Sequence, residues 1–242
     1  MLIAQITDIH AAPGNGNLAR LHGVISWIAT VRPDLLIVTG DLIDDGWHAG
    51  YPLIEAELKR ANCRFLVLPG NSDDKDAMRD CLQGTVKWAD KTALHISELI
   101  MGLPIVGMDT TQAGETRGDI TRHLDWLAGT LDGFSAPALV FMHHHLVPSG
   151  IAPIDRVMCH GAKEFGELIT QVRFPPIAVC SGHVHRSMSA VIAGVPAYIC
   201  GSICPANPLL LDNQIIPPVT DPPALMIHDV RNGYLVSSHV SV

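Results

Sequence analysis

The sequence lacks long apolar runs, an excess of positive charge and closely spaced cysteines. No apolar run approaches the roughly 20 residues of a membrane-spanning helix, and no basic segment precedes the apolar stretch at the amino terminus, so we expect a cytoplasmic protein without a membrane partner. With 16 Lys and Arg against 24 Asp and Glu, the net charge of −8 argues against binding polymeric nucleic acid. The six cysteines contain no C-x-x-C pair, which favours a reducing compartment.

The 242 residues, 48% of them hydrophobic, suffice for one core, and we expect a single domain over residues 1–242. Short apolar runs alternate with segments of helical period. Strands are expected at residues 2–6, 35–38, 65–68, 93–96, 105–108, 138–142 and 177–180, and helices at 18–30, 51–60, 75–82, 120–131 and 162–172.

The carboxyl-terminal part, from about residue 187 to 242, is β-rich, and we expect its strands to pair antiparallel. This part could mediate a homodimer. Residues 202–223 are rich in proline and show little periodicity, so they are expected to form a loop or an arm that reaches a partner subunit.

Metal-capable side chains follow five of the apolar strands. They are Asp8 and His10, Asp41, Asn71, His143, and His183 and His185. Because the carboxyl ends of strands in an open α/β sheet gather on one edge, we expect these side chains to meet there. In D-x-H and H-x-H, residues two apart on an extended segment point the same way, so both members of a pair reach one cluster of ions. Glycines 40, 70 and 182, each just before a ligand, would let the backbone approach closely.

The motifs D-x-H, G-D, G-N, H-H and G-H-x-H occur in the order typical of calcineurin-like metallophosphoesterases, and the sequence resembles that family from residue 6 to about residue 185. It is most similar to the bacterial class III cyclic-nucleotide and glycerophosphodiester phosphodiesterases, which share G-N-x-D-D-K, here residues 70–75, and F-M-H-H, here residues 141–144. The resemblance implies an α/β fold, a four-layer α-β-β-α sandwich with two mixed β-sheets packed face to face.

The resemblance also implies a centre of two metal ions. The first ion would take Asp8, His10 and His185, the second Asn71, His143 and His183, and Asp41 would bridge both. Nitrogen and oxygen ligands suit Mn, Fe, Co or Zn. A metal-bound hydroxide would attack the phosphorus of a small phosphodiester, with a cyclic nucleotide as the expected class. The ligand chemistry alone equally allows a phosphomonoesterase or a nucleotide pyrophosphohydrolase, and a non-catalytic metal-binding scaffold is the alternative of another class.

One position departs from the family pattern. The family usually has His directly after the Asn of the G-N motif, where it contacts the phosphoryl group or protonates the leaving oxygen, whereas this chain has Ser72. A serine hydroxyl does not titrate near neutral pH, and general acid catalysis typically contributes roughly 10²–10⁴-fold. His144, His145 and His48 are candidates for the missing role, unless a strained cyclic phosphate or a leaving group of low pKa needs less help.

The remaining candidates have simpler interpretations. They are Asp73 and Asp74, expected to cap the next helix; Asp44 and Asp45, expected to be solvated loop acids; Cys200 and Cys204, expected to be small buried apolar residues; and His160, which is equally open to a structural role or to one in the substrate pocket.

Overall fold

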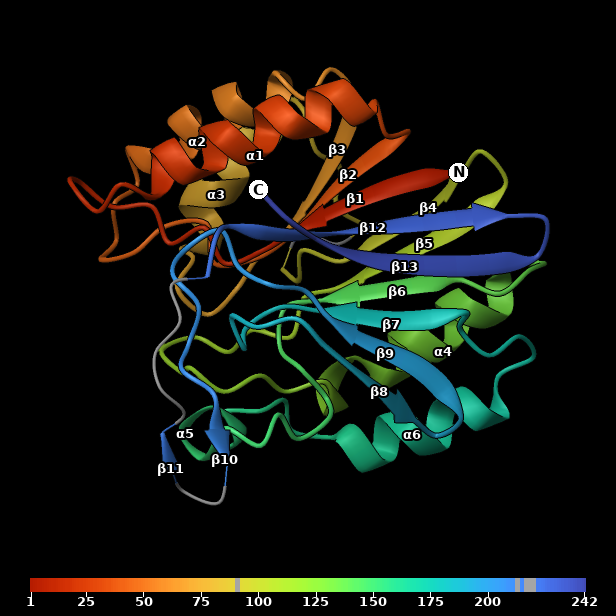
Figure 1. Ribbon diagram of the computed structural model, residues 1–242. Coiled ribbons are helices and arrows are strands. Elements are labelled where there is room, and N and C mark those ends of the chain that lie inside the picture. Colours follow the sequence, from red (N-terminus) through yellow and green to blue (C-terminus); the bar gives the residue numbers. More distant parts are fainter. Residues whose placement is uncertain (90–91, 212–213, 216–220) are drawn as a thin grey trace.

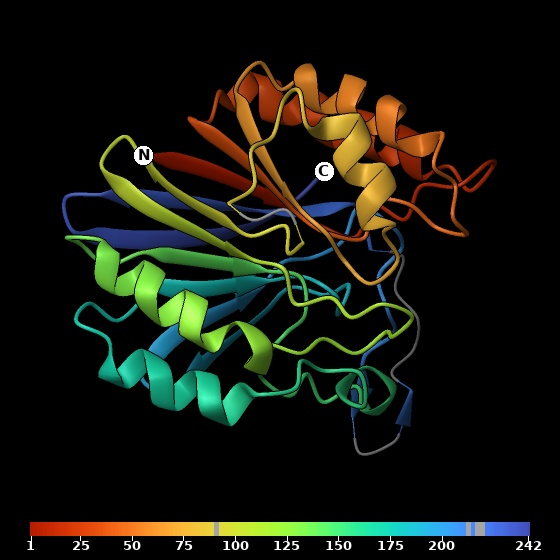
Figure 2. The ribbon, with the colours of Figure 1, turned by 180° about the vertical axis from the view of Figure 1, so that it is seen from behind.

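The computed structural model describes residues 1–89, 92–211, 214–215 and 221–242. Two β-sheets pack face to face in the middle of the molecule, and helices cover both outer faces (Figure 1; Figure 2 shows the same layers from behind). One outer layer contains α1 (Asn17–Val31), α2 (Gly50–Lys59) and α3 (Lys75–Leu82), and the other contains α4 (Leu124–Gly133) and α6 (Ala162–Gln171). The predicted four-layer α-β-β-α sandwich is therefore confirmed.

The first sheet has the strand order β13-β12-β1-β2-β3. Its strands are β1 (Leu2–Ile6), β2 (Leu35–Thr39), β3 (Arg64–Leu68), β12 (Ala224–Arg231) and β13 (Tyr234–Ser241). β1, β2 and β3 run parallel, and β12 joins β1 antiparallel. Because parallel neighbours need crossover connections, α1 and α2 lie between these strands in the chain and bury the outer face of the sheet.

The second sheet has the strand order β4-β5-β6-β7-β9-β8. Its strands are β4 (Ile96–Ile100), β5 (Leu103–Met108), β6 (Leu139–Met142), β7 (Ala178–Ser181), β8 (Met188–Ile192) and β9 (Val195–Ile199). The β-rich carboxyl-terminal part is thus divided between the sheets. Its hairpins β8–β9 and β12–β13 are antiparallel as expected, but β9 joins β7 in parallel, so the expectation is wrong at that contact. The homodimer stays a prediction.

One buried polar network crosses the space between the sheets, which apolar side chains otherwise fill. The Gln5 side-chain amide of β1 donates to Thr39 Oγ1 (3.0 Å) and to the backbone oxygen of Ser181 on β7 (3.1 Å). Its carbonyl accepts from His228 Nε2 of β12 (3.0 Å). A buried amide whose partners are all present holds its neighbours in one arrangement. Gln5 therefore fixes the two sheets against each other close to their carboxyl ends.

Two predicted elements differ from the structure, and one helix was not predicted. The strand expected at 93–96 lies further along the chain, because Met101 and Gly102 both have positive φ and form the two-residue turn that pairs β4 with β5. The helix expected at 120–131 begins with a 3₁₀ turn, Thr121–His123, before α4. The short helix α5 (Ala152–Asp155) follows β6 and was not predicted.

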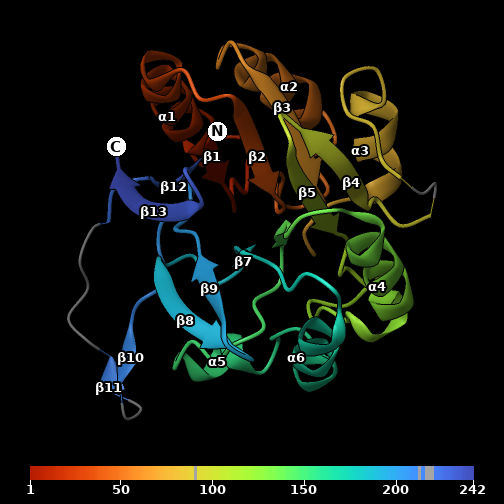
Figure 3. The ribbon, with the colours of Figure 1, turned by 90° about the vertical axis from the view of Figure 1, so that its right-hand side faces the viewer.

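Of the segment predicted as a loop or an arm, residues 212–213 and 216–220 lie outside the described part of the chain. The described remainder contains β10 (Leu210–Leu211) and β11 (Gln214–Ile215), an antiparallel pair that Figures 1 and 3 both place away from the two sheets. Leu210 packs on a small apolar cluster that includes Ile154 of α5. Within the described ranges, no helix combines the length and the apolar character needed to cross a bilayer.

Candidate metal centre

The seven predicted ligands all lie in the loops that follow β1, β2, β3, β6 and β7. Four of them form a first group. His10 Nε2 lies 3.2 Å from Asp41 Oδ2 and 3.1 Å from His185 Nε2. His185 Nε2 in turn lies 3.3 Å from Asp8 Oδ1. These four ligand atoms lie within 4.8 Å of one another, although their loops come from both sheets.

A second group shares Asp41 with the first. His143 Nε2 lies 3.3 Å from Asp41 Oδ2, 3.2 Å from Asn71 Oδ1 and 3.1 Å from His183 Nδ1. The same carboxylate oxygen of Asp41 therefore faces both groups. The division of the seven residues is the one that the resemblance implies.

The spacing within each group fits a metal ion. Ligand atoms about 2.1 Å from one ion lie about 3.0 Å apart at right angles and about 3.4 Å apart at tetrahedral angles. Six distances between neighbouring ligand atoms, 3.1–3.3 Å, fall in that interval, and His10 Nε2 lies further from Asp8 Oδ1, at 3.9 Å. Asp8 Oδ1 is buried and has no hydrogen-bond partner among the described residues, an arrangement that costs free energy unless a cation lies nearby. The residues present therefore fit divalent metal ions.

Five of the seven ligands have a left-handed backbone. They are Asp8 (φ 53°), His10 (φ 49°), Asp41 (φ 53°), His183 (φ 69°) and His185 (φ 57°). Non-glycine residues pay a steric cost in this region, and such residues cluster at functional sites. The expected geometry of D-x-H and H-x-H is wrong, because left-handed turns rather than an extended segment direct the members of each pair into the centre.

The glycines before the ligands mark close backbone approaches, as predicted. A Cβ on Gly40, whose φ is +95°, would lie 2.6 Å from the backbone nitrogen of Gly70. A Cβ on Gly70 would lie 2.2 Å from Asp41 Oδ1, and one on Gly182 would lie 2.0 Å from Thr7 Oγ1. Side chains at these three positions would displace the ligand loops.

His10 and His143 each have an oxygen partner on the ring nitrogen that points away from the centre. His10 Nδ1 donates to Asp44 Oδ1 (2.5 Å), and His143 Nδ1 donates to the backbone oxygen of Thr39 (2.8 Å). Such partners fix the ring orientation and leave the Nε2 lone pair for an ion. The expectation that Asp44 is a solvated loop acid is wrong, because its carboxylate orients His10. Asp45 is exposed, as expected.

Asp73 and Asp74 have different roles. Asp74 accepts from two backbone amides in the first turn of α3 and caps it, as predicted. Asp73 does not cap the helix, because its carboxylate accepts from the backbone nitrogens of Gly70 (2.9 Å) and Leu42 (3.0 Å) and so joins two ligand loops. Burial, together with the neighbouring Asp41 carboxylate, raises the pKa of Asp73 to about 7.

Burial and neighbouring charges shift the pKa values of the histidines in the centre. Burial lowers the pKa of His10, but hydrogen bonds to Asp41 and Asp44 outweigh it and raise the pKa to about 12. Burial opposes protonation of His143 as well, yet the Asp41 carboxylate raises its pKa to about 9. Burial and the nearby His143 lower the pKa of His183 to about 2. The strongest attraction for positive charge therefore lies beside Asp41, where the two groups meet.

The histidines next to His143 are not open to solvent. His144 is fully buried; its Nδ1 accepts from Thr110 Oγ1 (2.8 Å) and its Nε2 donates to the backbone oxygen of Thr116 (3.2 Å). His145 is also fully buried, with Nε2 3.6 Å from Asp155 Oδ1. Both rings are enclosed by protein, and their role at the leaving group stays a prediction.

The other candidates for the leaving group are placed differently. His48 is half exposed, and its Nε2 lies 3.1 Å from Asp74 Oδ2 at the start of α3. His160 is exposed, and its backbone bridges to Asp119. Ser72 adjoins the centre: its backbone nitrogen donates to Asp41 Oδ1 (2.8 Å), and its buried hydroxyl has no partner among the described residues.

Two cavities border the centre. One, of about 520 Å³, extends from Asn71 between α3 and the loop after β5, where Lys75, Arg79 and Gln112 line it.

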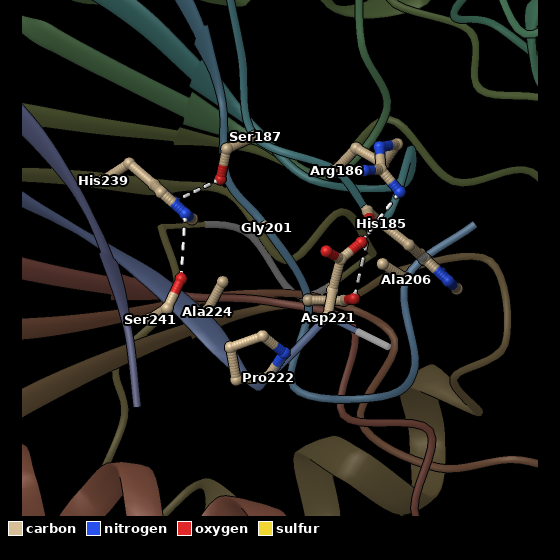
Figure 4. Close-up of a pocket in the computed structure, with 11 residues that line it drawn as sticks. His185, Arg186, Ser187, Gly201, Ala206, Asp221, Pro222, Ala224, His239 and Ser241 are labelled. Atoms are coloured by element: carbon tan, nitrogen blue, oxygen red, sulfur yellow. Dashed lines mark hydrogen bonds and ion pairs between the residues drawn. The ribbon is translucent and has the colours of Figure 1, made fainter. Parts of the chain in front are cut away.

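The other cavity, of about 200 Å³, borders His185. Figure 4 shows that its charged residues are paired across it, with Arg186 on Asp221. His239 of β13 is hydrogen-bonded between Ser187 and Ser241. This network joins the open edges of the two sheets beside the first group.

Comparisons with known proteins agree with this geometry. The chain is 28% identical over 218 residues to a glycerophosphodiester phosphodiesterase of Enterobacter lignolyticus, covering 82% of this chain and 78% of the relative. It is 29% identical over 223 residues to a cAMP/cGMP dual specificity phosphodiesterase of Mycobacterium tuberculosis, covering 84% and 67%. It is also 29% identical over 203 residues to the 3′,5′-cyclic adenosine monophosphate phosphodiesterase of Escherichia coli, covering 77% and 70%.

Solved structures share the fold. A dimetal phosphatase from Danio rerio superimposes with a TM-score of 0.76 at 14% identity, covering 100% of this chain and 96% of that one. The family model for calcineurin-like phosphoesterases matches residues 1–187, which contain all seven predicted ligands. The chain therefore belongs to the calcineurin-like phosphoesterase family.

Proposed function

We propose that this protein is a metal-dependent phosphodiesterase that hydrolyses a small phosphodiester, with cyclic nucleotides as the favoured class. The observation that carries the proposal is the convergence of seven side chains in two groups that share one oxygen of Asp41. Membership of a phosphoesterase family supports phosphate-ester hydrolysis. The relatives named as cyclic-nucleotide and glycerophosphodiester phosphodiesterases support a diester substrate.

Each group would hold one metal ion. The first position consists of Asp8, His10, Asp41 and His185, and the second of Asp41, Asn71, His143 and His183. Bound ions would polarise the phosphoryl oxygens and lower the pKa of water at the site. The nitrogen and oxygen donors suit Mn, Fe, Co or Zn.

The protein's own residues keep the centre in one arrangement. The Ser72 backbone nitrogen holds Asp41 Oδ1, so that Oδ2 faces both positions. Asp44 and the Thr39 carbonyl orient His10 and His143. Ligands held by hydrogen bonds before substrate arrives reduce the reorganisation needed during the reaction.

The cavity beside Asn71 supports a small substrate with a leaving group that needs little protonation. Its volume of about 520 Å³ lies in the range of small-molecule sites, roughly 300–1,000 Å³. No histidine is among the described residues that line it, and the cations Lys75 and Arg79 are paired with carboxylates. A chain that offers no histidine at this place favours a strained cyclic phosphate over an unactivated diester.

The test compares substrates under one metal loading. The purified protein is analysed for bound metal and then assayed with 3′,5′-cyclic AMP, 2′,3′-cyclic AMP, a glycerophosphodiester and a simple phosphomonoester. We expect bound metal and metal-dependent turnover, fastest with a cyclic nucleotide. Faster hydrolysis of the monoester would favour the phosphomonoesterase alternative, and bound metal without turnover of any substrate would favour the scaffold.

A further inference from the structure

Cys204 lies against one of the candidate ligands. Its Sγ is 3.3 Å from His185 Nδ1 and lies within 4.8 Å of a ring nitrogen of His10. Cys204 is buried, as expected, but its sulfur also contacts a candidate ligand. Cys200 differs, because its fully buried thiol donates to the backbone oxygen of Gln5 (3.4 Å).

The loop that carries Cys204 is hydrogen-bonded to the loop that follows β1. The backbone nitrogen of Cys204 donates to Asp8 O (2.9 Å), and that of Ile203 donates to Thr7 O (3.1 Å). Arg20 Nε of α1 donates to Ile203 O (2.5 Å). The sulfur is thus fixed with respect to the loop that carries Asp8.

The position of the sulfur bears on the tautomer of His185. The ring presents a lone pair on Nε2 only when its proton is on Nδ1, and a proton on Nδ1 needs an acceptor. Cys204 Sγ is the atom placed to accept it. On the other side of the ring, Nε2 faces Asp8 Oδ1, a fully buried carboxylate oxygen with no hydrogen-bond partner among the described residues.

We propose that Cys204 is a positioning residue for the first metal position. Its sulfur accepts a hydrogen bond from His185 Nδ1–H and thereby sets the tautomer that offers Nε2 to the ion. Asp44 has the same relation to His10. The proposal rests on the two metal positions of the proposed function.

The Cys204 thiol supplies the hydrogen-bond acceptor for His185 Nδ1–H at a buried place. The side chain is 5% exposed, so the loss of its sulfur leaves Nδ1–H without an acceptor. A hydroxyl both donates and accepts as a thiol does, so Cys204→Ser keeps the contact and Cys204→Ala removes it. Loss of such an outer partner typically weakens metal binding about 10- to 100-fold.

The experiment measures metal affinity without substrate. Metal-free wild type, Cys204→Ala and Cys204→Ser are titrated with Mn²⁺ or Zn²⁺ against a chelating indicator under reducing conditions. The titration is repeated in a His143→Ala background, which leaves only the first position intact. We expect Cys204→Ala to weaken the first position about 10-fold or more, and Cys204→Ser to stay close to wild type. Cys159→Ala is the control, because Cys159 is also buried and its sulfur contacts the backbone oxygen of His160 instead of a candidate ligand.

Two results would overturn the proposal. One is equal affinity of wild type and Cys204→Ala. The other is an equal loss at both positions together with a lower unfolding temperature of the metal-free protein, which would indicate general packing. Catalysis is measured separately, so weaker binding in Cys204→Ala by a protein that hydrolyses no phosphodiester would support the role of Cys204 and refute the proposed function.

Discussion

The two metal positions share Asp41 but are supported in different ways. In the first, the side chains of His10 and His185 are 15% and 18% exposed, and other side chains, Asp44 and Cys204, hold their outer nitrogens. In the second, His143 is fully buried, and a backbone carbonyl holds its outer nitrogen. We therefore expect single side-chain substitutions to change the metal affinity of the first position. The metal affinity of the second position should depend on the backbone at the strand ends.

Both metal positions depend on the Asp41 carboxylate, so substitution of Asp41 is expected to have the largest effect. Asp41→Asn keeps the shape of the side chain but removes the charge between the positions, so we expect the affinity of both to fall and kcat/KM to drop about 10³-fold or more. Metal titration and turnover of a cyclic nucleotide measure this. The exposed neighbour Asp45→Asn is the matched control and should behave as wild type. If Asp41→Asn lowered the metal affinity of one position alone, the two positions would not share the Asp41 oxygen.

Gly40→Ala tests the dependence of the second position on the backbone. The added Cβ would meet the backbone nitrogen of Gly70 at 2.6 Å and His143 Nδ1 at 2.8 Å, at a φ of +95°. We expect the second position to lose affinity about 100-fold and the free energy of unfolding to fall by about 1–3 kcal/mol. Chemical denaturation and metal titration measure the two effects.

Gly84→Ala is the control for that change, because a Cβ there meets nothing within 4 Å and its φ is ordinary. Unchanged metal affinity in Gly40→Ala would mean that the loops after β2 and β3 can shift to accommodate the added Cβ. The second position would then not depend on the backbone more than the first does.

Asp44→Asn probes the side-chain support of the first position. An amide still reaches His10 but is a weaker acceptor than a carboxylate, so we expect about a 10-fold loss of affinity at the first position and none at the second. The titration designed for Cys204 measures both. An equal loss at both positions would show that Asp44 acts through the field of the whole centre and not through His10.

The ligands of both positions could be predicted from the sequence, but the side chains that support them could not. Asp41, Asn71 and His143 could be found from the sequence, because each follows an apolar strand whose end must lie at the sheet edge. Asp44 and Cys204 could not, since their contacts depend on loop conformation. The left-handed turns at Asp8 and four other ligands could not be predicted either, because strand periodicity carries no information beyond the strand end.

Local sequence patterns also predict only part of the fold. The strands follow from the apolar runs and the two-sheet sandwich from the family resemblance, but the place of β9 beside β7 depends on a long-range pairing that no local pattern specifies. The start of β4 was missed because the Met101–Gly102 turn lacks the usual Asn-Gly or Asp-Gly signal.

The smallest effect is expected at Ser72, which follows the second position along the chain. Ser72→His introduces a titratable ring at a place where the hydroxyl is buried and has no partner among the described residues. General acid catalysis by a well-placed group contributes roughly 10²–10⁴-fold, but this ring would have no packing evolved to orient it. We therefore expect a rise in kcat of only a few-fold, confined to a glycerophosphodiester whose leaving alkoxide needs a proton. Turnover of a cyclic nucleotide should not change. If kcat on the glycerophosphodiester stays the same or falls while metal affinity is retained, another group already protonates the leaving oxygen, and the substrate preference inferred from the cavity beside Asn71 loses its basis.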